Sequence, residues 1–124
     1  MENEKRHESG LNVMEELFSP EVRTVMAEMK DISPDFYNMI VSFGFGELYA
    51  REAISLKHRE YITLTTLITQ GAFDQYRVHL QAALNIGLTK EEIIEIIIQC
   101  VGYVGFPKAV QAMGIAKEVF EKNQ

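Results

Sequence analysis

The strongest indication of the fold class lies in residues 89–101, which read TKEEIIEIIIQCV. Thr89 and Glu92 have the spacing of a capping box, in which a threonine caps the first turn and a glutamate reaches back to it. The isoleucines that follow would also suit a strand, but Glu95 and Gln99 lie four residues apart, on one helical face. A helix that is apolar on nearly every side belongs at the centre of a fold or against another subunit. We therefore expect a helix here, and a homo-oligomer.

Helix start and stop signals recur on both sides of this segment. Ser19-Pro20 and Ser33-Pro34 each place a serine at an N-cap and a proline at the first helical position. Gly87 suits the end of one helix, and Gly105 suits the end of another. The apolar spacing between these signals is helical, without sustained alternation of period two. The sequence predicts an all-α fold, a single compact domain of six to seven helices over residues 1–124, with a frayed start at residues 1–10.

The composition excludes several classes of function. The net charge is −6 and the basic residues do not cluster, which argues against a nucleic acid or an anionic membrane as partner. The charged N-terminus lacks the apolar core of a signal peptide, and the apolar stretch 93–105 is too short to span a bilayer. Cys100 is the only cysteine, so an intrachain disulfide is excluded. We expect a soluble, cytoplasmic protein.

Few residues have the chemistry of a catalytic site. His7 and His58 stand in charged surroundings, and we expect both to be solvated, whereas His79 lies in the middle of an apolar helix. His79 is either a buried, hydrogen-bonded side chain or a functional one. Glu60 should face the core and would then need a partner, because an unpaired buried carboxylate is costly. No metal-ligand spacing occurs, so we expect no metal and no cofactor, and Cys100 should be structural.

Three blocks of sequence carry a resemblance to a known family. The blocks are Glu47-Leu48-Tyr49-Ala50-Arg51 with Ser55-Leu56-x-x-Arg59-Glu60, then residues 79–93 (HLQAALNIGLTKEEI), then Tyr103-Val104-Gly105-Phe106-Pro107. In this order and spacing the chain resembles the carboxymuconolactone decarboxylase family over residues 36–120. The resemblance implies a helical fold of the alkylhydroperoxidase D type, assembled as trimers or hexamers.

The resemblance also separates two kinds of chemistry. The peroxidase branch of the family has Cys-x-x-Cys ahead of its histidine, with a glutamate upstream. With that histidine placed on His79, the cysteines fall on Ala72 and Gln75 and the glutamate falls on Glu60. A thiol-dependent peroxidase working through Cys100 is therefore disfavoured.

The decarboxylase branch implies a lyase acting on a lactone that bears two carboxylates. Arginine suits carboxylate binding, and we assign this role to Arg51 and Arg59. His79, oriented by Glu60, would serve as acid or base, and the Tyr103 hydroxyl could assist. The expected partner is a small carboxylated lactone or a related enolisable acid. A non-enzymatic small-molecule binder of the same fold remains the alternative.

Overall fold

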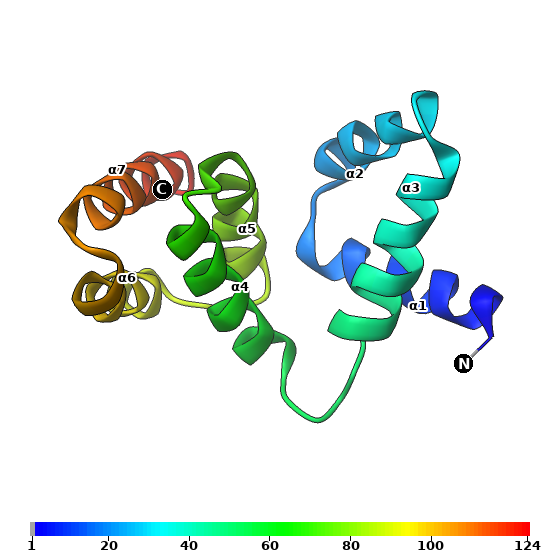
Figure 1. Cartoon of the computed structure of the whole chain (residues 1–124), viewed down its shortest axis with the longest axis horizontal. Helices are drawn as coiled ribbons and strands as arrows, with labels where there is room; N and C mark the ends of the chain where they lie inside the picture. Colours follow the sequence, from blue (N-terminus) through cyan, green and yellow to red (C-terminus); the bar gives the residue numbers. More distant parts are fainter. Residues whose placement is uncertain (1) are drawn as a thin grey trace. The chain divides into compact units, whose positions relative to one another are not determined.

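The computed structural model describes residues 2–124, and within them it contains helices and no strand (Figure 1). The predicted all-α class is confirmed. The α-helices are α1 (Asn3–Leu17), α2 (Pro20–Ala27), α3 (Pro34–Met39), α4 (Leu56–Gln70), α5 (Phe73–Asn85), α6 (Lys90–Val104) and α7 (Phe106–Lys122). A 3₁₀ turn, η1 (Glu28–Asp31), and a π-helix, η2 (Ile40–Tyr49), complete the elements.

The helices group into two compact units, one ending at Leu56 and one running from Lys57 to Gln124. The expectation of one domain over residues 1–124 stays a prediction.

In the first unit, α1 packs along the π-helix η2. Two glycines bring the helix backbones together, because a Cβ atom at Gly10 would collide with the Val41 carbonyl and one at Gly46 with the Arg6 carbonyl. Apolar side chains fill the remaining space. The buried ones are Met14, Leu17, Phe18, Tyr37, Val41 and Phe45. This crossing therefore depends on residues that lack a side chain.

The start of the chain differs from the expectation of a frayed segment at residues 1–10. Helix α1 begins at Asn3, while Met1 lies outside the described residues. Arg6 pairs with Glu47 at 2.9 Å, and His7, which we expected to be solvated, is half-buried with Nδ1 3.4 Å from the Ser42 hydroxyl. Glu47 lies 41 residues from Arg6 in the sequence, and Ser42 lies 35 residues from His7. Packing against η2 therefore orders a segment whose local composition suggests fraying.

In the second unit, α4, α5, α6 and α7 enclose one apolar core. The capping box of Thr89 and Glu92 is present as predicted. Gly87 and Gly105 have φ angles of 102° and 85°, a left-handed conformation that glycine adopts without strain. Tyr76 crosses the core, and its hydroxyl donates a hydrogen bond of 3.0 Å to the Ala112 carbonyl. This hydrogen bond joins α5 to α7 across the core.

None of the helices formed by residues 2–124 has both the length and the apolar character that crossing a bilayer requires.

Candidate active site

Glu60 is the unusual residue of the second unit. It lies on α4, on the face that also carries Leu64 and Ile68, and its side chain has no exposed surface. No other charged residue of the described chain is buried. Removing a carboxylate from water costs several kcal/mol unless another group compensates it, so the position of Glu60 requires a partner.

His79 of α5 is a partner of Glu60. Its Nδ1 lies 2.9 Å from Oε1 and 3.2 Å from Oε2 of Glu60. The imidazole is 15% exposed, whereas the carboxylate is completely covered. A carboxylate accepts hydrogen bonds, so we assign the Nδ1 proton to the histidine as donor. The pair consists of a buried anion that holds an imidazole at the edge of the core.

The arginines predicted to bind substrate lie in different units. Arg59 is half-buried on α4, directly before Glu60. Arg51 is exposed and follows the end of η2 in the first unit. Arg59 is thus the arginine that belongs to the same helix as the acid of the pair.

Tyr103 is placed elsewhere. It is 85% exposed on α6 and lines a groove of about 700 Å³ between α4 and α6. The groove is lined by Tyr61, Thr65, Thr69, Glu91, Glu92, Glu95, Ile96, Gln99, Cys100, Tyr103 and Val104. Glu60 and His79 do not belong to this lining, and the three glutamates at its margin would repel a dicarboxylate. The structure therefore does not bring Tyr103 together with His79 in this groove.

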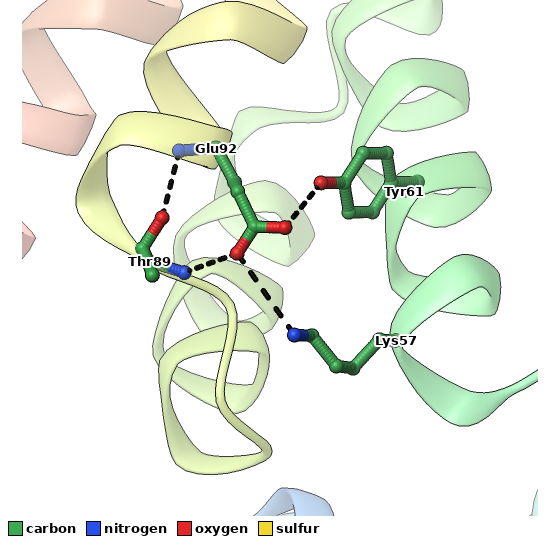
Figure 2. Close-up of polar contacts among 4 residues, drawn as sticks. All are labelled: Lys57, Tyr61, Thr89 and Glu92. Carbon is green, nitrogen blue, oxygen red and sulfur yellow. Dashed lines mark hydrogen bonds and ion pairs between the residues drawn. The ribbon is translucent and has the colours of Figure 1, made fainter.

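A polar network joins α4 to the start of α6 (Figure 2). Glu92 accepts hydrogen bonds from the Tyr61 hydroxyl at 2.6 Å and from the Thr89 backbone N–H at 2.9 Å, and Lys57 lies 4.0 Å away. The hydrogen bond from Tyr61 is the main cause that lowers the pKa of Glu92, and the same bond raises the pKa of Tyr61. The capping role of Glu92 was predictable from the sequence. Its bond to Tyr61 was not, because no local signal links residues 31 positions apart.

Cys100 is buried at the floor of the same groove. Burial raises the pKa of its thiol, and a hydrogen bond with Thr65 offsets part of that effect. A thiol with a raised pKa is a poor nucleophile. The structural role expected for Cys100 stays a prediction. Among residues 2–124, no group of three or more His, Cys, Asp or Glu side chains is arranged to hold a metal ion.

Comparison with known proteins identifies the family of this chain. Residues 34–118 match the family described as the carboxymuconolactone decarboxylase family. The chain belongs to this family. The match covers more than half of the chain and confirms the resemblance seen in the three blocks of sequence.

Several known proteins are similar to this chain over most of their own length. The 4-carboxymuconolactone decarboxylase of Acinetobacter baylyi is 35% identical over 98% of this chain and 91% of its own. An uncharacterized 15.0 kDa protein of Paracoccus denitrificans is 31% identical over 79% of this chain and 75% of its own. The nitrosuccinic acid decarboxylase of Metarhizium robertsii is 24% identical, over 90% of this chain and 78% of its own. Two relatives named as decarboxylases support the interpretation of this chain as a carboxy-lyase-like enzyme.

Proposed function

We propose that the protein is a decarboxylase of small carboxylated lactones or related enolisable acids, with His79 as the group that transfers the proton. The observation that carries the proposal is the fully buried Glu60 carboxylate, which faces Nδ1 of His79 with both oxygens. Such a carboxylate orients an imidazole by accepting the hydrogen bond from its Nδ1. The names of two relatives point to the same type of reaction.

The reaction needs one bond to break and one to form. Loss of CO₂ breaks a carbon–carbon bond and leaves its electron pair on the substrate as an enolate-type anion. Protonation at carbon then completes the reaction, with one proton consumed. Because Glu60 contacts Nδ1, this proton transfer falls to Nε2 of His79.

The substrate carboxylates require cationic partners. We assign this role to Arg59, which adjoins Glu60 on α4. The role expected for Arg51, which belongs to the first unit, stays a prediction from the sequence. A guanidinium binds a carboxylate through two parallel hydrogen bonds that lysine cannot reproduce. Tyr103 is left out of this assignment because it lies in the acidic groove.

The decisive variant is His79→Asn. The asparagine amide keeps a hydrogen-bond donor near the position of Nδ1, so Glu60 is not left buried without a donor, but it cannot transfer the proton. We expect kcat to fall on the order of 10²- to 10⁴-fold, the usual contribution of a general acid or base. CO₂ release would be measured against a panel of carboxylated lactones and small enolisable or nitro-substituted acids.

His58→Asn is the matched control, because His58 is an exposed histidine that precedes Glu60 on the same helix. Its turnover should equal that of the unmodified protein. Turnover that survives in folded His79→Asn would disprove the assignment. Ligand-dependent melting shifts without turnover of any compound would instead support the non-enzymatic binder.

A further inference from the structure

Neither Glu60 nor His79 lines the groove between α4 and α6, so the reaction proposed above does not account for it. The groove has a volume of about 700 Å³, within the range of sites that bind small molecules. Its lining follows three rows of side chains that repeat every four residues, because such residues share one face of a helix. The rows are Tyr61, Thr65 and Thr69 on α4, then Glu92, Ile96, Cys100 and Val104 on α6, then Glu91, Glu95, Gln99 and Tyr103 on α6.

The row that contains Ile96 forms an apolar floor. Ile96 and Cys100 are buried, and Val104 is half-buried. Tyr61 and Thr69 are separated by about two helical turns, roughly 12 Å, so the groove has room for an extended alkyl chain. Covering such a floor with an apolar group is favourable, because apolar surface is removed from water. The floor therefore favours a ligand with an apolar body.

The charge of the lining has one sign. The lining contains three glutamates and no Lys, Arg or His. Lys57 and Lys108 adjoin it, but Lys57 lies 4.0 Å from Glu92, and the Lys108 amine donates to the Thr69 carbonyl. Glu91 and Glu95 are exposed and lie four residues apart on α6, where like charges repel each other. A cation bound beside these two carboxylates would relieve the repulsion.

The hydroxyl groups on the α4 side of the groove have already donated their protons. Tyr61 donates to Glu92 at 2.6 Å, Thr65 donates to the Tyr61 carbonyl at 2.8 Å, and Thr69 donates to the Thr65 carbonyl at 2.8 Å. A hydroxyl that has donated its proton can still accept a hydrogen bond. This side of the groove therefore favours a ligand that brings its own donors, as an ammonium group does.

We propose that the groove binds a small organic cation, an ammonium group that carries an apolar body. The ammonium group lies beside Glu91 and Glu95, and the apolar body covers the floor at Ile96 and Cys100. Tyr103, which is 85% exposed at the margin, adds an aromatic face that attracts a cation. The proposal does not depend on the decarboxylase reaction, whose carboxylate substrate has the opposite charge.

The first test compares three ligands with the same eight-carbon chain. Isothermal titration calorimetry would measure the Kd of octylammonium, octanol and octanoate with the unmodified protein. Octylammonium should bind at a saturable site, octanol at least about fivefold more weakly, and octanoate without measurable affinity. Added salt should weaken the binding of octylammonium more than that of octanol. No binding of octylammonium, or equal affinity for octanol, would overturn the proposal.

The second test removes the two exposed carboxylates. The double variant Glu91→Gln, Glu95→Gln should bind octylammonium roughly three- to tenfold more weakly, with the affinity for octanol unchanged. The double variant Glu118→Gln, Glu121→Gln is the matched control, because it changes the net charge equally on α7, outside the lining. Its affinity for octylammonium should be that of the unmodified protein. An equal loss in both variants would contradict a site in the groove.

The third test fills the groove. Thr65→Trp places a large side chain between the two helices and should abolish the binding of octylammonium. Thr66→Trp is the control, because Thr66 is the next residue of α4, is exposed and does not line the groove. Circular dichroism would verify that both variants are folded, and if Thr65→Trp is not, the glutamine variants decide the question. Unchanged affinity of folded Thr65→Trp would overturn the proposal.

Discussion

The buried carboxylate of Glu60 affects both the stability of the fold and the proposed chemistry of His79. A fully buried anion is tolerated only where a donor or a cation compensates it, and His79 supplies a donor at 2.9 Å. Truncating His79 to alanine would therefore remove the reacting group and also leave the carboxylate without this donor. Loss of activity in His79→Ala would combine the two effects. The His79→Asn variant separates the two effects, because it keeps a hydrogen-bond donor for Glu60 and loses only the nitrogen that transfers the proton.

The hydrogen bond from Tyr61 to Glu92 leads to a pH-dependent prediction. The pKa of Glu92 is lowered from 4.5, so its contribution to stability is present above that pH and is lost as the pH falls through the lowered value. The pKa of Tyr61 is raised from 10.0, so its contribution is present below pH 10 and is lost as the pH rises through the raised value. Tyr61→Phe should therefore lower Tm most between about pH 5 and pH 9, with a smaller difference at both extremes.

Melting curves between about pH 3 and pH 10.5 would measure this difference across both titrations. Tyr103→Phe is the control, because it removes a hydroxyl from a tyrosine that is 85% exposed. Its Tm should follow that of the unmodified protein at every pH. A Tyr61→Phe difference that is the same at all pH values would show that the hydroxyl does not act through the Glu92 carboxylate.

At the scale of elements, the close crossing of α1 and η2 is the most sensitive feature of the first unit. The π-helix is rare and occurs mostly as a single turn within an α-helix. The element η2 is longer, because it covers the ten residues Ile40–Tyr49. Its carbonyl at Val41 lies where a side chain at Gly10 would extend. The close approach of α1 to η2 therefore requires a glycine at position 10.

Gly10→Ala should destabilise the protein by about 1–3 kcal/mol, the usual cost of inserting a methyl group into a filled site. The colliding group is a backbone carbonyl, which cannot turn aside as a side chain would. Urea unfolding followed by circular dichroism would measure the loss. The same experiment on Gly46→Ala should give a loss of similar size, because its added methyl would meet the Arg6 carbonyl.

Gly44→Ala is the matched control within η2, because a Cβ at this glycine meets nothing within 4 Å. Its stability should be unchanged or slightly higher, since alanine has less backbone freedom to lose than glycine. Equal stability of Gly10→Ala and Gly44→Ala would show that α1 does not approach η2 as closely as described.

At the scale of the whole molecule, charge is distributed unevenly between the two units. The unit ending at Leu56 contains five Lys and Arg against eleven Asp and Glu, whereas the unit from Lys57 onward contains seven of each. The entire net charge of −6 thus belongs to the first unit. An anionic substrate is therefore expected to bind in the second unit, where the Glu60–His79 pair also lies.

The segment between the units should be the first site of proteolysis. Residues 51–55 are exposed and outside the helices, and Arg51 is the basic residue among them. Exposed connecting segments are the preferred sites of proteolytic nicking. Brief trypsin treatment should therefore release fragments 1–51 and 52–124, identified by mass spectrometry. Arg51→Gln should delay this cleavage, and early cuts within α5 or α7 would contradict the division into units.

The local signals of the sequence were sufficient for the fold class. A capping box, Ser-Pro starts and closing glycines act within a few residues, so they can be recognised without tertiary structure. The blocks around Glu60 and His79 sufficed in the same way for the family, which the match over residues 34–118 confirms. The sequence also predicted that the carboxylate of a core-facing Glu60 would need a partner, because burying any unpaired carboxylate is costly.

Tertiary packing decided the features that join distant segments. Glu60 and His79 are separated by 19 residues in the sequence, and Arg6 and Glu47 are separated by 41. Local helix propensity does not predict contacts between residues so far apart. Packing also ordered residues 3–10, which the composition suggested were frayed, and placed Tyr103 in a groove lined by three glutamates. The physical reason is common to all three. Short-range sequence patterns determine which residues form a helix, whereas the side chains that meet depend on how the helices pack.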